Sequence, residues 1–237
     1  MAAPKDLGEL VVKLRSIKKL GFVKTHRSND TGIGKTLEDL LDIPENNLRL
    51  PDVGDVELKA KRLDSDSMLT IATKSPEPKG ANKKLFEQYK YKDDEGYYNL
   101  HSTVYGSRTN SQGLKAMVLR DSIAIENPYS VEVYWPVSIF DDVLVSKSNK
   151  ILLVFANTKG ERKTSKECFN FCEAYLLSNL NKEKFQKAIS KDKLKIDFRI
   201  GVYRSGPSIG RYHDHGTGFR INKRDFLELF DSYEQLI

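Results

Sequence analysis

The sequence predicts an α/β or α+β fold, in which a mixed central sheet is flanked by helices. Segments with helical and with strand-like periodicity alternate along the 237 residues, without an internal repeat. The apolar run at residues 151–156 is typical of a buried central strand, and short extended segments follow one another between residues 100 and 135. With 39% hydrophobic and 30% charged residues, the chain has the composition of a globular protein with a substantial core.

Helical spacing of apolar residues predicts a first helix over residues 5–20, which Gly21 is placed to end. Further helices are predicted over residues 36–43, 81–91, 139–145, 165–180, 182–190 and 225–236. Alternating polarity predicts a strand over residues 52–62, paired with residues 68–73 through a polar turn. Other strands are predicted over residues 100–107, 114–126, 131–135, 150–157, 194–203 and 219–221, with a polar loop at 204–218.

The net charge of +6 is compatible with a polyanionic partner such as a nucleic acid. Lys and Arg cluster at residues 13–27, 59–62, 74–92 and 199–224. No apolar run approaches the ~18 residues that span a bilayer, and no secretory segment is visible, so we expect a cytoplasmic protein. Cys168 and Cys172 lie four residues apart on the predicted helix 165–180, which favours small buried side chains over a zinc site or a disulfide.

The segment from Asp52 to Lys59 carries the strongest chemical signal. On a strand, residues i and i+2 share a face, so Glu57 and Lys59 point the same way while Leu58 points into the core. Asp52 lies just upstream, across Gly54, where the chain can bend. Two carboxylates and one ammonium group at a strand end can hold Mg²⁺ and orient a water for phosphodiester hydrolysis. The structural alternative is a solvated strand face with alternating charges.

Residues 32–36 look like the end of a phosphate-binding P-loop, but Asn29 stands where that motif requires glycine. A turn that starts the next helix is therefore expected, and Glu38 on this helix matters only if the helix packs beside the cluster at residues 52–59. The proline-stiffened loop at residues 73–82 is either a simple turn or a backbone contact, in which Lys74 and Lys79 meet DNA phosphates.

The densest polar cluster lies at residues 213–220. The residues of this cluster that could bind a ligand or a metal are His213, Asp214, His215 and Arg220. Three interpretations remain open: a transition-metal site that lacks an obvious further ligand, a solvated loop, or a set of base-edge contacts.

Several stretches occur in the order found in one nuclease family, namely residues 31–41, 51–59, 69–76, 80–82, 199–201 and 213–222. Over about residues 5–236 the chain thereby resembles the MvaI/BcnI family of type II restriction endonucleases, which is related to the MutH mismatch-repair nickase. The resemblance implies a PD-(D/E)xK, restriction-endonuclease-like fold, with a mixed central sheet flanked by helices and a second, smaller lobe that forms a DNA cleft. Residues 1–237 would be one nuclease domain, with a catalytic lobe including about 5–92 and 150–180 and a recognition lobe including about 195–222.

By motif, the resemblance makes Asp52, Glu57 and Lys59 the catalytic set, with Asp52 and Glu57 as Mg²⁺ ligands and Asp55 as a weaker candidate. Glu38 corresponds to an upstream helix residue that supports this site. The base-edge motif of the family matches four residues here, His213, Asp214, His215 and Arg220.

The family also implies a monomer that nicks double-stranded DNA one strand at a time, at short pseudo-palindromic sites of the CCNGG kind, with a cognate DNA methyltransferase as genetic partner. Thr73 and the Thr217–Gly218 pair resemble the branch that reads CC(A/T)GG. The branch that reads a central C·G or G·C pair tends to carry histidines in these two motifs, and this chain has none at Thr73 or Gly218. Residues 93–150 show few family motifs. The rival functions are a MutH-like, methylation-sensitive repair nickase and a sequence-specific DNA-binding protein that has lost catalysis.

Overall fold

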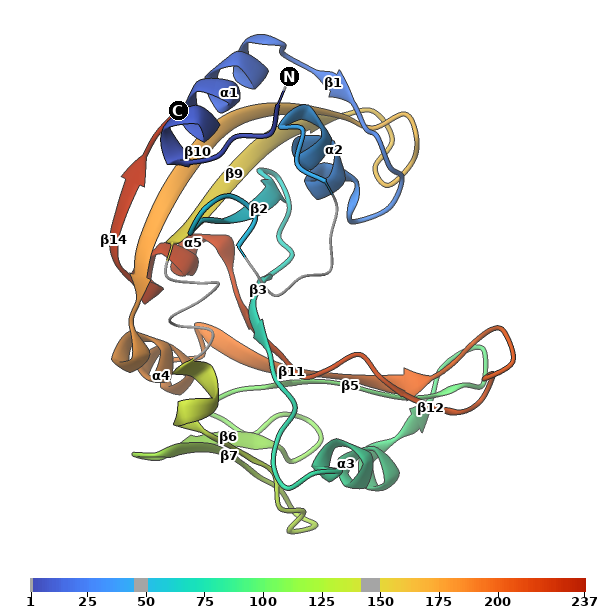
Figure 1. The fold of residues 1–237 in the computed structure, drawn as a ribbon. Helices are drawn as coiled ribbons and strands as arrows, with labels where there is room; N and C mark the ends of the chain where they lie inside the picture. The colour runs from blue at the N-terminus through green and yellow to red at the C-terminus, as the bar shows by residue number, and fades with distance from the viewer. Residues whose placement is uncertain (1, 45–50, 142–149) are drawn as a thin grey trace. The chain divides into compact units, whose positions relative to one another are not determined.

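The computed structural model describes residues 2–44, 51–141 and 150–237, and the chain forms two compact units (Figure 1). Unit 1 comprises Met1–Asp66, Asp142–Asn181 and Phe230–Ile237, and unit 2 comprises Ser67–Asp141 and Lys182–Leu229. Residues 67–92, which we expect in the catalytic lobe, thus belong to the second unit. The end of the helix expected over residues 139–145 lies outside the described residues.

Unit 1 is built on a five-stranded mixed sheet. Its strands are β1 (Val23–Lys24), β2 (Glu57–Arg62), β9 (Lys150–Lys159), β10 (Cys168–Leu180) and β14 (Phe230–Gln235). The order is β1-β10-β9-β2, and β14 also pairs with β10. Strand β2 runs parallel to β9, whereas the other pairs are antiparallel. Within the described part of the chain, β2 therefore forms an edge of this sheet.

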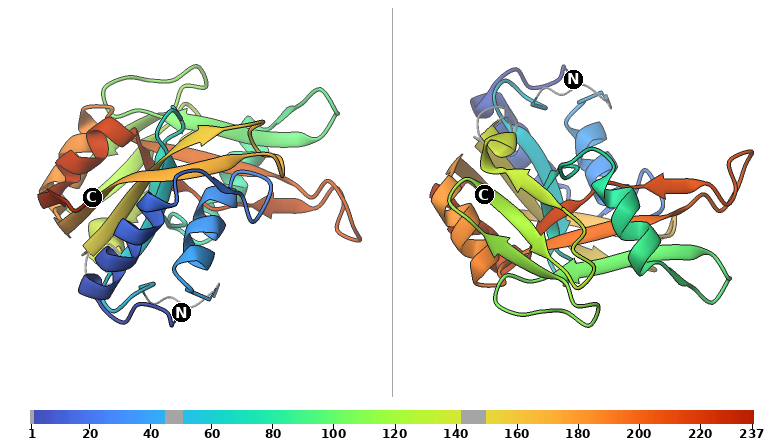
Figure 2. Two further views of the ribbon diagram at one scale, coloured as in Figure 1. Left: turned by 90° about the horizontal axis from the view of Figure 1, so that it is seen from above. Right: turned by 90° about the horizontal axis from the view of Figure 1, so that it is seen from below.

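Helices α1 (Leu7–Lys19) and α2 (Gly32–Leu40) lie over one face of this sheet, as the left view of Figure 2 shows. Helix α1 begins after Asp6, whose side chain accepts a hydrogen bond from the backbone N–H of Glu9 at 2.9 Å. The apolar sides of both helices pack on alternate strand residues in a core that includes Leu10, Leu14, Ile33, Leu37, Leu152, Val154, Phe169 and Phe171. The prediction of a first helix is confirmed, and α2 begins four residues earlier than predicted.

Unit 2 contains a six-stranded sheet and a three-stranded sheet, both antiparallel. The larger sheet has the order β3-β13-β11-β5-β4, with β12 beside β11. Its strands are β3 (Leu69–Thr73), β4 (Tyr91–Lys92), β5 (Tyr98–Val104), β11 (Leu194–Val202), β12 (Tyr212–Asp214) and β13 (Gly218–Ile221). The smaller sheet comprises β6 (Lys115–Val118), β7 (Ser122–Glu126) and β8 (Tyr134–Pro136).

The helices of unit 2 cover these sheets. Helix α3 (Ala81–Tyr89) packs against β5 and β11, and α4 (Lys182–Ser190) packs against β6 and β11 (Figure 2, right). Two 3-10 turns, η1 (Val137–Phe140) and η3 (Leu227–Leu229), and the short helix α5 (Lys223–Phe226) complete the unit. The core is aromatic, with ring contacts among Trp135, Phe140, Phe185, Phe198 and Phe219. The mixed α/β class predicted from the sequence is confirmed.

Several local predictions are wrong. The strand predicted over residues 114–126 is a hairpin of β6 and β7, and the loop predicted over residues 204–218 contains β12. The helix predicted over residues 165–180 is the long strand β10, which pairs with β9 on one side and with β1 and β14 on the other. The helix predicted over residues 225–236 is α5, a 3-10 turn and β14. The predicted hairpin between residues 52–62 and 68–73 does not form, because β2 pairs with β9 and β3 pairs with β13.

Cys168 and Cys172 consequently lie on a strand rather than a helix. Both thiols are free and half-buried, so the expectation of fully buried side chains is not met. Among the described residues, no helix combines the length and the apolar character needed to cross a bilayer.

Candidate active site and nucleic-acid interface

Strand β2 carries Glu57 and Lys59 on one face of the sheet of unit 1. Leu58 and Ala60 pack against the core beneath α1 and α2, so the alternation of the strand directs the two charged side chains to the opposite face. Lys59 Nζ lies 3.6 Å from Glu57 Oε1, and the two side chains are 24% and 15% exposed. The pair is largely shielded from water yet reachable from outside, as a site for a polar substrate requires.

A tight turn places Asp52 beside the start of β2. Reciprocal backbone hydrogen bonds of 3.1 and 2.8 Å join Val53 and Val56, and Gly54 adopts the left-handed conformation with φ of +56°. The Asp52 Oδ2 atom accepts a hydrogen bond of 2.7 Å from the backbone N–H of Leu58. The turn therefore brings the Asp52 carboxylate back to the first residues of β2.

The neighbouring carboxylate of Asp55 is engaged elsewhere. It forms an ion pair of 2.5 Å with Lys150 at the start of β9, and its side chain is 68% exposed. The hydrogen bond from Lys150 lowers the pKa of Asp55. This geometry favours Asp52 over Asp55 as the partner of Glu57.

Glu38 lies on α2, which packs against β2 on the face of Leu58 and Ala60, opposite the face to which Glu57 and Lys59 point. A role of Glu38 at this site therefore stays a prediction. The helix is anchored at its start by the buried Thr36, whose hydroxyl donates to the carbonyl of Gly32 at 2.7 Å and accepts from the N–H of His26 at 3.0 Å. Glu38 itself is half-buried.

The donor atoms of this site fit Mg²⁺. Mg²⁺ is usually held by one or two carboxylates and completes its coordination with waters and phosphate oxygens. Asp52 and Glu57 provide two such carboxylates. In residues 2–44, 51–141 and 150–237, no group of three or more His, Cys, Asp or Glu side chains is arranged to hold a metal alone, so an all-protein cage of the zinc type is not supported.

In unit 2, one face of the six-stranded sheet gathers polar side chains; we call it the reading face. Asp197 of β11 lies opposite Thr103 of β5. Arg199 lies opposite His101 in the same ladder. Directly opposed residues point to the same side of a sheet. A cavity of about 500 Å³ opens on this face, lined by His101, Ser102, Thr103, Asp197, Phe198, Arg199, His215 and Arg220.

Arg220 is held in place on the reading face. Its Nη1 donates to Asp197 Oδ2 at 2.7 Å, and its Nη2 donates to the carbonyl of Met68 at 3.4 Å. The Asp197 side chain is 8% exposed and that of Arg220 is 25% exposed. The guanidinium is thus oriented by a nearly buried carboxylate while part of it reaches the cavity.

The Asp214 side chain stabilises the loop that follows β12 by hydrogen bonds. Its Oδ1 accepts from the N–H of Gly216 at 2.7 Å, and its Oδ2 accepts from Asn82 Nδ2 at 2.8 Å. Asn82 Nδ2 also lies 3.1 Å from the hydroxyl of the buried Thr217. Both carboxylate oxygens therefore stabilise the loop, and a base contact by Asp214 stays a prediction.

The two histidines of the cluster lie against each other. The His213 ring stacks on Tyr203 at 4.2 Å between centroids and meets the His215 ring edge-on at 4.2 Å. Burial lowers the pKa of His215, and the charges of His213, Arg199 and His101 lower it further. A neutral imidazole offers one donor and one acceptor, which suits a base edge. The metal interpretation of this cluster is not supported in the described residues.

Thr73 and Gly218, the positions that favour a CC(A/T)GG-like site, are cross-strand partners between β3 and β13. Gly216 has a φ of +81°, and a Cβ there would lie 2.4 Å from the Thr73 methyl. Next to Thr73, the backbone of Lys74 is fixed by hydrogen bonds to Thr217 and from the Trp135 indole. Lys79 is exposed.

His101 and Arg199 are functional candidates that the sequence interpretation missed. Both lie on the reading face, and Arg199 Nη2 reaches the carbonyls of His215 and Gly216 at 3.4 and 3.3 Å. The alternation of polar and apolar residues along 194–202 contains the signal, because it places Arg199 and Asp197 on one face.

Comparisons with known proteins bear on the identity of this fold. The model of the MvaI/BcnI restriction endonuclease family matches residues 11–230. A solved structure described as a restriction endonuclease MvaI–cognate DNA substrate complex is 34% identical, with 100% of both chains covered and a TM-score of 0.86. Restriction endonuclease MvaI in the absence of DNA is 33% identical over 100% of both chains, with a TM-score of 0.60. A search of curated proteins found no match. The fold is restriction-endonuclease-like, and the chain belongs to the MvaI/BcnI restriction endonuclease family.

Proposed function

We propose that this restriction endonuclease hydrolyses phosphodiester bonds of double-stranded DNA in the presence of Mg²⁺, at a short pseudo-palindromic site of the CCNGG kind, with CC(A/T)GG favoured. The observation that carries the proposal is the turn that fixes Asp52 to the amide of Leu58, beside the Glu57–Lys59 pair. Unit 1 would be the catalytic lobe and unit 2 the recognition lobe of one nuclease.

The catalytic roles follow from the chemistry of the side chains. Asp52 and Glu57 would hold the metal, and a bound Mg²⁺ supplies charge neutralisation at the phosphate and an acidified water. The Lys59 ammonium group, 3.6 Å from Glu57, places the attacking water and stabilises negative charge that develops on the phosphate. Glu38 supports this arrangement from α2, through a water or through Lys59.

Sequence recognition falls to the reading face. Arg220 offers a pre-oriented guanidinium for the acceptor edge of a guanine, and His213, Asp214 and His215 belong to the same site. The small side chains at Thr73 and Gly218 leave room at the central base pair, as in the CC(A/T)GG branch. Lys74 and Lys79 hold the backbone.

The sequence contains one Asp52–Glu57–Lys59 set. A monomer with one active site cuts the two strands in separate encounters, so a nicked duplex precedes the linear product. Such an enzyme works in the cytoplasm, where a cognate methyltransferase protects the host DNA.

The test is digestion of sequenced, unmethylated phage DNA with Mg²⁺, followed by mapping of the ends. We expect linear fragments that end within CC(A/T)GG-like sites, without any added partner. A product that stays nicked until a repair partner is added would favour the MutH-like nickase. Specific binding without cleavage at any Mg²⁺ concentration would favour the DNA-binding protein.

A further inference from the structure

A second cationic feature lies at the end of β5, beyond the cavity that Arg220 lines. The guanidinium carbon of the exposed Arg108 lies 4.2 Å from the centroid of the Tyr105 ring. Lys195 Nζ lies 6.0 Å from the same centroid. Two cations thus share one aromatic ring. Within the described part of the chain neither lies within ion-pair distance of a carboxylate, and the charge of Arg108 is one of the causes that lower the pKa of Asp192.

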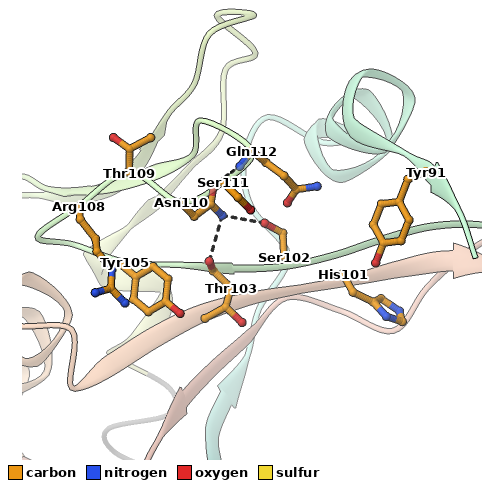
Figure 3. A pocket seen from close by; sticks show the side chains of 10 residues that line it. All are labelled: Tyr91, His101, Ser102, Thr103, Tyr105, Arg108, Thr109, Asn110, Ser111 and Gln112. Carbon is orange, nitrogen blue, oxygen red and sulfur yellow. Dashed lines mark hydrogen bonds between the residues drawn. The ribbon is translucent and has the colours of Figure 1, made fainter.

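The loop that carries Arg108 is fixed at both ends. The Asp192 carboxylate accepts from the N–H groups of Gly106 and Ser107 at 2.9 and 2.8 Å, and from the Ser107 hydroxyl at 2.5 Å. At the other end, Asn110 Nδ2 donates to the Thr103 carbonyl at 3.0 Å (Figure 3). A Cβ on Gly106 would lie 2.3 Å from a backbone oxygen of α4, so this approach requires glycine. The loop therefore presents Arg108 from a fixed frame, with the Asp192 oxygens used within the loop.

This feature continues the reading face. His101, Thr103 and Tyr105 alternate along β5 and its end, so they point to the same side. His101 and Thr103 line the cavity of Arg220 and also a second cavity of about 560 Å³, which Tyr105 and Arg108 complete (Figure 3). The two cavities adjoin along β5.

The spacing matches a DNA groove. From β13, which carries Arg220, to β5 there are two strand spacings, or ~10 Å. Arg220 lies opposite Lys195 in the β13–β11 ladder, and Lys195 reaches the Tyr105 ring, so the three residues form one row across the strands. The major groove is about 12 Å wide, so a base edge at its middle lies roughly 6 Å from each bordering backbone, and cations two strands from Arg220 lie at or just beyond that border.

We propose that Arg108, stacked on Tyr105 and supported by Lys195, is a phosphate clamp that grips the DNA backbone at the border of the reading face. The proposal rests on the proposed DNA-binding role of unit 2. The aromatic ring holds the guanidinium plane in place, which reduces the freedom lost when a phosphate binds. A contact of this kind positions the duplex and carries no sequence information.

The first experiment measures binding of Arg108→Ala to cognate and scrambled duplexes in Ca²⁺ over a series of salt concentrations. We expect the same fold-loss on both duplexes and a salt slope lower by about one. The matched control is Arg120→Ala, which removes an exposed arginine of the same unit in the turn between β6 and β7, and should leave affinity and slope unchanged. Tyr105→Phe keeps the ring and should bind as wild type, whereas Tyr105→Leu should reproduce part of the Arg108→Ala loss.

The second experiment locates the phosphate. Duplexes that carry one neutral methylphosphonate at each backbone position in turn are bound by wild type and by Arg108→Ala. At one or two adjacent backbone positions, the methylphosphonate should weaken DNA binding by the wild-type protein. At the same positions it should not weaken DNA binding by Arg108→Ala any further. An identical interference profile in both proteins, or a loss confined to the cognate duplex, overturns the clamp. If the wild-type protein does not prefer cognate over scrambled DNA, the proposed function itself is wrong. If the wild-type protein does prefer cognate DNA and Arg108→Ala binds both duplexes as Arg120→Ala does, only the clamp proposal is wrong.

Discussion

Replacing Arg220 with alanine should damage both sequence discrimination and stability, for separable reasons. Arg220 would read a guanine through the part of its guanidinium that faces the cavity, while its Nη1 neutralises Asp197 at 2.7 Å. The variant Arg220→Ala removes both interactions at once. The double variant Asp197→Asn/Arg220→Ala also removes the carboxylate that the single variant leaves behind.

The two magnitudes differ in origin. Breaking a fully buried ion pair from one side costs about 3–5 kcal/mol. Asp197 is 8% exposed, but Arg220 is 25% exposed, so water reaches the site and we expect about 2 kcal/mol in the free energy of unfolding. For a chain of this length that corresponds to roughly 4–8 °C in Tm. Loss of a bidentate arginine–guanine contact costs ~1–3 kcal/mol, about 5- to 150-fold in Kd, on the cognate site alone.

The assay combines thermal melting with binding to cognate and scrambled duplexes in Ca²⁺. The double variant should recover most of the melting temperature and none of the discrimination. An equal loss of affinity on both duplexes for Arg220→Ala would remove it from the reading set and make it a backbone contact. A double variant as unstable as the single one would refute the argument from the stranded Asp197 charge.

The remaining predictions concern catalysis, strand order, backbone contact and pH. Asp52→Ala and Lys59→Ala should each lower cleavage by ~10³-fold or more while cognate binding in Ca²⁺ persists; near wild-type cleavage by either would invalidate the active-site assignment. On supercoiled plasmid, open circles should precede linear DNA, and a stable dimer that yields linear DNA directly would contradict this order. Lys79→Ala should weaken cognate and random DNA alike and lower the salt slope by about one, and a loss on cognate DNA alone would argue against a phosphate contact. Glu167, 1% exposed, is paired with Arg62 at 2.7 Å; burial opposes its ionisation, but the hydrogen bonds from Arg62 hold its pKa below the usual 4.5. The stability this pair contributes is therefore present above pH 4.5 and is lost as pH falls through the lower folded pKa. Glu167→Gln should be less stable than wild type at pH 7, with a difference that narrows below pH 4.5; a constant difference would refute this linkage.

The sequence by itself determined the features that depend on neighbouring residues. The faces of Glu57, Lys59 and Leu58 follow from the two-residue period of a strand, and α1 and α4 follow from helical spacing. The family likewise was visible in the order of its motifs, and the match over residues 11–230 confirms it. These signals depend only on residues close together in the sequence, so they can be recognised without knowing which segments pack or pair in the folded chain.

Strand β10 shows why other features were not visible. A bulge between Phe171 and Glu173 shifts the register, so Phe171 and Ala174 pack in the same core although they lie three residues apart. After the bulge the strand is buried on both faces, and Leu177, three residues beyond Ala174, is buried on the opposite face, so the spacing of buried residues imitates a helix. Only pairing with the preceding strand β9 and with β14, which is distant in sequence, makes this segment a strand.

The same holds for the site. The parallel pairing of β2 with β9, the packing of α2 on β2, and the meeting of Arg220 with Asp197 all join residues far apart in the chain. The register of β11 between β5 and β13 assembles the reading face from three segments. His101 lies in no family motif, and the motif at residues 199–201 gave Arg199 no role. The candidate catalytic residues lie on one turn and one strand, so they could be predicted from the sequence. The reading face is formed by several strands, so only the tertiary structure decided its composition, because long-range pairing determines which side chains become neighbours.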